Sequence, residues 1–249
     1  MQGKSQLAIL ISLFLALFSA ALALFSLALF GLLLVGVSPP EAPLFGPIPS
    51  FPARLAVNLA LWTLFGVQHS VMARASFKDW LRRFAPFLSE RTLYVFLSAV
   101  VTLTLVLLWQ PLHGSIWKLH FPLSLLADGI GVLGFLLALI SSSLIDGLDL
   151  VGLRRPLLAL KGRGYEAPRL VTPLFYRVVR HPIQLGVILL LWGTAHMSTD
   201  RLFMAICATL YILIALPMEE RELEAEHGEA YRSYRARVPR LIPRIRRGN

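Results

Sequence analysis

Long stretches without a single charged residue restrict the fold of this sequence more than any other feature. Residues 5–40, 55–73 and 92–117 contain no Asp, Glu, Lys or Arg. Each can supply the roughly 20 helical residues that cross a bilayer core of about 30 Å. Charged residues make up only 15% of the chain, whereas a soluble domain carries roughly 25%. A soluble globular fold is therefore excluded, and the sequence predicts a helical membrane protein.

Three further apolar stretches bring the expected number of transmembrane helices to five or six. They comprise residues 121–145, 181–199 and 202–218, and the last two are short and nearly contiguous. We expect these two to form a helical hairpin with a tight turn, in which Thr199 or Asp200 caps the second helix. A re-entrant pair that does not cross the bilayer completely is the alternative.

The sequence predicts one all-α membrane domain over residues 1–249, a polytopic helix bundle with a short helical tail. Its first apolar stretch continues to Val37, beyond the length of a signal peptide, so we expect an uncleaved anchor that also offers a dimer surface. The expected parts are an N-terminal helix at 6–37, a Pro-rich loop at 38–52, three transmembrane helices within 53–146, a cytoplasmic connector at 147–180, the hairpin at 181–217 and a cytoplasmic tail at 218–249.

The basic residues predict how the chain is oriented. The sequence has 24 Lys and Arg against 14 Asp and Glu, a net charge of +10. With the N-terminus in the cytoplasm, 21 of the 24 basic residues fall on the cytoplasmic side of the expected helices, as the positive-inside rule requires. We therefore expect an integral protein of the bacterial inner membrane with both termini in the cytoplasm. Most of the positive charge then orients the protein in the membrane, where membrane lipid is its partner. The net charge therefore no longer supports nucleic-acid binding.

Cysteine usage removes several kinds of site. The single cysteine, Cys207, excludes a disulfide framework and a Cys-based zinc site. No other cluster has the spacing of metal ligands, so we expect no metal. Candidate chemistry must come from polar side chains in or beside the helices, where ionisable groups are costly and are functional candidates.

One group of polar residues lies at the cytoplasmic ends of the expected second and third helices. His69 shares a helical face with Phe65, and Arg91, Tyr94 and Ser98 form a stripe that runs inward along the next helix. The structural interpretation is an interfacial histidine and polar residues that hold helices together. The functional interpretation is a pocket open to the cytoplasm.

A second group ends the fourth expected helix. Helical spacing predicts that Ser142, Asp146 and Asp149 share one face. Arg154 and Arg155 follow closely, so a structural ion pair explains the acidic residues as well as a functional role does.

The third group combines basic and acidic residues. Pro182 suits the first turn of a helix, which places Arg180 and His181 at a helix N-terminus that favours anionic groups. Glu219 and Glu220 stand where the last helix leaves the membrane. We expect both clusters at the same membrane face, an arrangement that suits a zwitterionic ligand.

These motifs carry a resemblance to known enzymes. The C-terminal half resembles the membrane superfamily of isoprenylcysteine carboxyl methyltransferases and phospholipid methyltransferases. The matching residues are Leu170-Val171-Thr172, Tyr176, Arg180-His181-Pro182, Gly186 and Glu219-Glu220. Segments 68–74, 90–94, 109–111 and 144–146 in the N-terminal half resemble the methanethiol S-methyltransferases within that superfamily.

The resemblance implies methyl transfer from S-adenosylmethionine to a small thiol, forming a thioether such as dimethyl sulfide. It also implies that the C-terminal motifs build the cofactor site. The implied cofactor-binding residues are Leu170, Val171, Thr172, Tyr176, His181, Pro182, Gln184 and Glu219, with Gly186 and Glu220 in the same motifs.

Two differences from the superfamily pattern concern ligands. Gln184 stands where a tyrosine is usual, and an amide cannot close a pocket as an aromatic ring does. Residues 212–218 carry no charge, whereas the carboxyl methyltransferases have an arginine in this region. The second difference favours a small neutral substrate.

Thiol chemistry assigns roles to the remaining candidates. A thiol reacts as its thiolate, so we expect His69 to accept the proton and Tyr94 to orient it. Arg91 or Arg180 provides a positive field, and Asp146 orients His69 or Arg91. The alternatives are methyl transfer to a lipid amine or a prenylcysteine carboxylate, and a non-enzymatic membrane protein of a nitrogen-oxide system.

Overall fold

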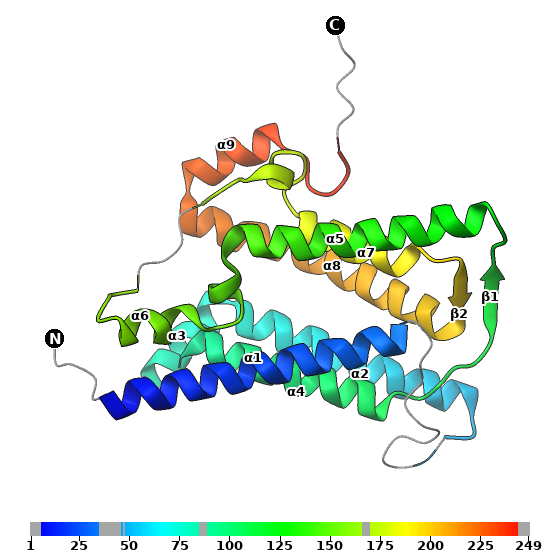
Figure 1. The fold of residues 1–249 in the computed structure, drawn as a ribbon, viewed down its shortest axis with the longest axis horizontal. Coiled ribbons are helices and arrows are strands. Elements are labelled where there is room, and N and C mark those ends of the chain that lie inside the picture. Colours follow the sequence, from blue (N-terminus) through cyan, green and yellow to red (C-terminus); the bar gives the residue numbers. More distant parts are fainter. Residues whose placement is uncertain (1–5, 35–45, 47, 85–88, 166–169, 244–249) are drawn as a thin grey trace, which may run out of the picture. The chain divides into compact units, whose positions relative to one another are not determined.

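The computed structural model describes residues 6–34, 46, 48–84, 89–165 and 170–243. Helices dominate these residues, and the described strands form one two-stranded sheet. The expected all-α class is confirmed. The chain divides into two compact units (Figure 1). Unit 1 comprises Met1–Leu112 and Gly147–Ala167, and unit 2 comprises His113–Asp146 and Pro168–Asn249.

Five of the described helices are long and apolar enough to cross a membrane, which confirms an integral membrane protein. A sixth apolar helix, α7 (Pro182–Trp192), has 11 residues and is about 16 Å long. It is therefore shorter than a bilayer core of about 30 Å. The five long helices are α1 (Gln6–Leu34), α2 (Phe51–Ala73), α4 (Glu90–Leu108), α5 (Leu123–Leu150) and α8 (Thr199–His227).

Unit 1 is built around α4, which packs against both α1 and α2 (Figure 1). Ala16, Ser19, Ala20 and Ser26 are buried on α1. Small residues of this kind let membrane helices approach closely. Two short helices, α3 (Ala75–Phe84) and α6 (Arg154–Leu160), complete the unit. Most of the expected Pro-rich loop lies outside the described residues, and α2 begins within its last two positions.

A buried amide fixes the end of α4 to α2. The Nδ2 atom of Asn58 donates to the carbonyl of Gln110 over 2.8 Å, and the Gln110 amide nitrogen donates to Oδ1 of Asn58 over 2.9 Å. The side chain of Gln110 accepts a hydrogen bond from the amide nitrogen of Ile48. The charge-free stretch at 92–117 is therefore not one span, because α4 ends at Leu108 and the chain turns into this clamp.

Unit 2 contains the expected hairpin, since α7 packs against α8. Glycines also let α7 pack closely against α5. A Cβ atom at Gly186 would lie 2.6 Å from the amide nitrogen of Ala138 and 2.6 Å from the carbonyl oxygen of Gly134. Only a residue without a side chain fits at this crossing.

A small sheet that the sequence did not predict lies beside the hairpin. Strand β1 (Ser115–Lys118) pairs antiparallel with β2 (His196–Ser198). The expected cap of α8 is wrong, because the Ser198 hydroxyl accepts the hydrogen bond from the Arg201 amide over 3.1 Å. Residues 196–198 pair with β1, and the cap of α8 lies at Ser198, one residue before the expected Thr199.

The end of α5 also differs from expectation. Asp146 has φ −178° and ψ 87°, which is not helical. Ser142, Asp146 and Asp149 therefore do not share one continuous helical face, and that prediction is wrong. Spacing alone cannot detect such a break, because the flanking residues keep a helical pattern.

The last long helix extends further than expected. Instead of ending at residue 217, α8 continues through the acidic segment to His227. Glu, Leu and Ala favour helix strongly. Gly228 then adopts φ 55° and separates α8 from α9 (Glu229–Arg237). One continuous helix thus carries the acidic pair out of the membrane-spanning stretch.

Candidate functional site

A buried ion cluster in unit 2 surrounds Glu220, whose side chain is 2% exposed. Arg180 donates to Oε1 of Glu220 from Nη2 over 2.6 Å and from Nε over 2.9 Å. Arg240 donates to Oε2 over 2.5 Å, and Nε2 of His181 lies 3.2 Å from Oε1. The hydrogen bond with Glu220 raises the pKa of Arg240. Two guanidinium groups thus compensate the charge of one buried carboxylate, and an imidazole lies within hydrogen-bond distance of it.

The backbone of the tail holds this cluster in place. The amide nitrogens of Arg180 and His181 donate to the carbonyls of Pro239 and Arg240 over 2.8 and 3.2 Å. Arg180 also donates from Nη1 to the carbonyl of Val238. Because Pro182 opens α7 directly after His181, these bonds tie the start of α7 to the end of the tail.

Glu219 lies beside the cluster but differs in exposure. Its side chain is 46% exposed. Nε2 of Gln184 donates to its Oε2 over 3.3 Å, and Nδ1 of His181 lies 3.9 Å from its Oε1. The adjacent acidic residues therefore have different environments: Glu220 is buried among its ion-pair partners, and the carboxylate of Glu219 is half-exposed.

Three tyrosines, Tyr176, Tyr231 and Tyr234, belong to the same unit as the ion cluster. The Tyr234 hydroxyl donates to the carbonyl of Tyr176 over 2.6 Å, and the Tyr176 hydroxyl donates to the carbonyl of Ser141 over 3.4 Å. Burial raises the pKa of Tyr231 and of Tyr234 to about 12. Both phenols are therefore neutral hydrogen-bond donors at physiological pH. Leu170 packs against these two tyrosines.

The remaining residues implied by the resemblance have simpler environments. Val171 is 48% exposed, and Pro182 is fully buried in the first turn of α7. The carbonyl of Thr172 accepts a hydrogen bond from Nε of Arg177. Gly186 allows a close approach to α7, and the group that approaches it is the backbone of α5.

Unit 1 holds the second group of candidates, which face one another from α2 and α4. The Tyr94 hydroxyl lies 2.7 Å from Nε2 and 3.0 Å from Nδ1 of His69. Both side chains are partly buried. The ring of Phe65 stacks on His69, with centroids 5.3 Å apart and planes at 25°. The phenol and the stacked ring together fix the orientation of the imidazole.

Polar neighbours extend this pair in both directions along α4. Nε2 of Gln68 donates to the Ser98 hydroxyl over 3.2 Å. The guanidinium of Arg91 lies 5.5 Å from the centroid of the Tyr94 ring, and its Nε donates to the carbonyl of Asp149 over 3.0 Å. The polar stripe predicted on α4 therefore faces the histidine of α2. The expected role of Asp146 stays a prediction, since that residue belongs to unit 2.

Sequence reasoning missed one member of the ion cluster. Arg240 was grouped with the other basic residues of the tail, although it holds the second oxygen of Glu220. A signal was present, because a buried carboxylate such as Glu220 needs cationic partners and the tail that follows it is rich in arginine. Among the described residues, no group of three or more His, Cys, Asp or Glu side chains is placed to hold a metal ion.

Comparison with known proteins identifies relatives along most of the chain. No protein-family model matches the sequence, and no solved structure matches it significantly. Nurim of Rattus norvegicus is 30% identical over 181 residues, which cover 69% of this chain and 68% of that protein. The match is consistent with the membrane superfamily that the motifs indicated.

Two bacterial enzymes match more strongly. Methanethiol S-methyltransferase 2 of Bradyrhizobium diazoefficiens is 43% identical over 191 residues, covering 77% of this chain and 74% of the relative. A methanethiol S-methyltransferase of Mycobacterium tuberculosis is 43% identical over 190 residues, covering 76% and 78%. The expected class, a methyltransferase enzyme, is thereby confirmed. At 43% identity over about three quarters of its length, the chain belongs to the methanethiol S-methyltransferase family.

Proposed function

We propose that this protein transfers a methyl group from S-adenosylmethionine to methanethiol and forms dimethyl sulfide. The observation that carries this proposal is the 43% identity to relatives named methanethiol S-methyltransferase over about three quarters of the chain. Unit 2 holds the candidate residues for the methyl donor, and unit 1, taken by itself, holds a candidate base for a thiol proton.

The cluster of unit 2 fits a polar, zwitterionic donor. Glu219 offers a half-exposed carboxylate to an ammonium group, to a sulfonium or to ribose hydroxyls. The Ser141 hydroxyl is buried and forms no hydrogen bond with the described residues. Because buried polar groups are normally hydrogen-bonded, this unpaired hydroxyl supports a polar ligand in this unit.

The cluster of unit 1 fits a small thiol. His69 accepts the thiol proton, Tyr94 fixes the imidazole in position, and the Arg91 guanidinium stabilises negative charge on sulfur. S-adenosylmethionine, when bound, supplies an electrophilic methyl group: the thiolate forms the new carbon–sulfur bond as the bond to the sulfonium breaks, which leaves S-adenosylhomocysteine. The stacked Phe65 ring gives the imidazole an apolar neighbour and limits access of water.

The location of the protein is part of the proposal. The distribution of basic residues supports insertion in the bacterial inner membrane with both termini in the cytoplasm. Both candidate clusters stand near the ends of helices that the same rule assigns to the cytoplasmic side. The homodimer stays a prediction.

Glu219→Gln tests the donor site. We expect this variant to weaken S-adenosylmethionine binding about 10- to 100-fold, because a hydrogen bond to a charged group contributes about 1.5–3 kcal/mol. Isothermal titration calorimetry on the purified protein in detergent measures the dissociation constant. Glu226→Gln is the matched control, since Glu226 is an exposed carboxylate further along α8.

The same titration distinguishes the alternatives. If the wild-type protein binds neither S-adenosylmethionine nor S-adenosylhomocysteine, the proposal is wrong and a non-enzymatic membrane protein is favoured. If it binds them, methanethiol, a phospholipid amine and a prenylcysteine are compared as acceptors. Faster methylation of either lipid acceptor than of methanethiol would contradict the thiol assignment.

His69→Ala tests the thiol side. General base catalysis contributes about 10²- to 10⁴-fold to a rate, so we expect kcat at neutral pH to fall by about that factor. Raising the pH should restore most of the rate, because solvent then ionises the thiol. Production of dimethyl sulfide is measured by gas chromatography across the pH range.

Two further variants complete this test. Tyr94→Phe keeps the ring but removes the hydroxyl that contacts His69, and a smaller loss of kcat is expected. Thr104→Val is the control, because Thr104 lies on the same helix and only donates to the carbonyl of Val100. Unchanged turnover in both His69→Ala and Tyr94→Phe, with intact folding, would exclude this assignment.

A further inference from the structure

Helix α3 is a short amphipathic helix at the membrane-surface end of α2. It begins one residue after Arg74, which caps the C-terminus of α2. Since α2 is one of the apolar membrane-crossing helices, its direct connection keeps α3 close to the bilayer surface. Leu81 is 3% exposed and anchors one side of α3 in unit 1. The rest of the helix stays available to the surroundings.

The outer side of α3 carries an aromatic edge. Trp80 is 52% exposed and Phe84 is 70% exposed, and their ring centroids are 5.4 Å apart. Phe77 continues the row, with its centroid 5.7 Å from that of Trp80. Water is a poor environment for such a row, whereas tryptophan is enriched in the interfacial layer of membranes. The edge therefore fits the boundary between acyl chains and headgroups.

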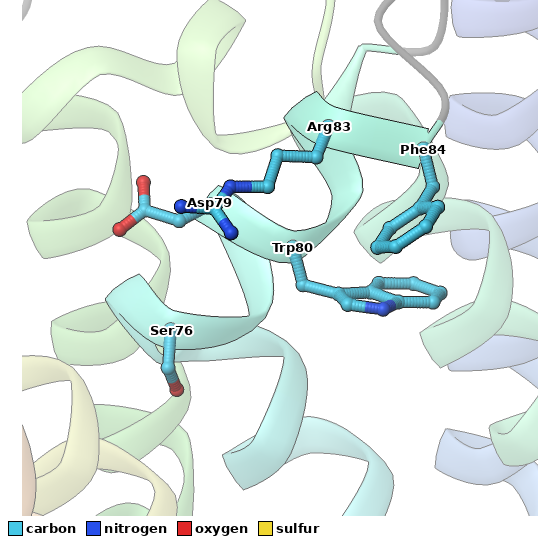
Figure 2. Close-up of a pocket in the computed structure, with 5 residues that line it drawn as sticks. All are labelled: Ser76, Asp79, Trp80, Arg83 and Phe84. Atoms are coloured by element: carbon cyan, nitrogen blue, oxygen red, sulfur yellow. The ribbon is translucent and has the colours of Figure 1, made fainter.

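Basic residues flank this edge. Figure 2 shows a shallow surface pocket lined by Ser76, Asp79, Trp80, Arg83 and Phe84, with the two rings side by side and the Arg83 side chain directed away from them. Arg82 is shared by two carboxylates, with Nη1 2.9 Å from Oδ1 of Asp79 and Nε 2.6 Å from Oε1 of Glu90. Among the described residues, none forms an ion pair with Arg83. The exposed guanidinium is thus available to an anion outside the protein.

We propose that α3 lies in the headgroup layer and binds an anionic phospholipid. The phosphate group contacts Arg83 and the Ser76 hydroxyl, and the acyl chains contact Trp80 and Phe84. Charge complementarity supports this occupant, because residues 74–84 contain four basic residues and one acidic residue. Polybasic segments next to a membrane helix favour anionic lipids. This inference is independent of the proposed methyl transfer.

Quenching of Trp80 fluorescence by brominated lipid tests the proposal. The full-length protein is placed in nanodiscs that contain equal amounts of phosphatidylcholine and phosphatidylglycerol, with dibrominated acyl chains on only one of the two lipids. The difference between wild type and Trp80→Phe isolates the contribution of Trp80, because the other four tryptophans are present in both. We expect brominated phosphatidylglycerol to quench this contribution at least twofold more than brominated phosphatidylcholine.

Charge variants identify the residue responsible for the preference. Arg83→Gln should make the two lipids equally effective, whereas Arg221→Gln, which removes an exposed arginine from α8, should leave the preference unchanged. Equal quenching by both lipids in the wild type would overturn the anionic site. Absence of Trp80-dependent quenching by either lipid would overturn the membrane contact itself. A preference that survives Arg83→Gln would overturn the assignment of Arg83. Size-exclusion chromatography verifies that each variant remains folded.

Discussion

Replacing Glu220 by glutamine is expected to lower the free energy of unfolding by about 3–5 kcal/mol. The substitution keeps the shape of the side chain but removes the charge that offsets Arg180 and Arg240. Arg180 is only 8% exposed, so water cannot replace the lost partner. Removing one member of a buried ion pair leaves an uncompensated charge, which costs more than the pair itself contributes. Denaturant titration in mixed micelles measures the effect.

Glu219→Gln provides the comparison within the same pair of residues. Because the Glu219 side chain is 46% exposed, its replacement should change the free energy of unfolding by less than about 1 kcal/mol. Stability and donor affinity should therefore separate: Glu220 controls the first and Glu219 the second. Equal destabilisation by the two substitutions would contradict the different environments of the two carboxylates.

Gly186→Ala is expected to destabilise unit 2 by at least about 1–3 kcal/mol, the usual cost of inserting atoms into a close-packed contact. The new methyl group would lie 2.6 Å from two backbone atoms of α5. Backbone cannot rotate away as a side chain can, so α5 and α7 must separate. Thermal unfolding in detergent, monitored by the loss of the helical circular dichroism signal, measures the change.

Gly129→Ala is the matched control on α5. A Cβ atom at Gly129 would meet nothing within 4 Å, and alanine favours helix over glycine by about 1 kcal/mol. This variant should be as stable as the wild type or slightly more stable. If Gly186→Ala unfolds at the same temperature as Gly129→Ala, the close crossing of α5 and α7 is not present in the protein. A loss of donor affinity without a loss of stability would instead place Gly186 against the ligand.

Much of the helical architecture could be predicted because a bilayer imposes a length on apolar helices. The charge-free stretches located α1, α2, α4 and α8, and helical spacing placed Arg91, Tyr94 and Ser98 on one stripe of α4. Both predictions depend on local periodicity, which the sequence displays directly. The acidic pair was also found in this way, because Glu219 and Glu220 follow a long apolar run.

Features that depend on distant partners could not be predicted in the same way. Strand β1 exists because residues 115–118 meet residues 196–198, and no local pattern marks that pairing. The break in α5 at Asp146 could not be predicted either, because the residues on both sides of it continue a helical pattern. The different environments of Glu219 and Glu220 follow from Arg180 and Arg240, which lie 40 and 20 positions from Glu220 along the chain.

The bonds that tie the start of α7 to the tail also determine when the cluster can form during synthesis. Arg180 is translated 60 residues before Arg240, because it precedes Glu220 by 40 positions and Arg240 follows it by 20. At about 5–20 residues per second, the ribosome needs about 3–12 s for that interval. Until Arg240 has been synthesised, the residues at the start of α7 lack their hydrogen-bond partners in the tail. The ion cluster around Glu220 can therefore be completed only after all the apolar helices have been synthesised.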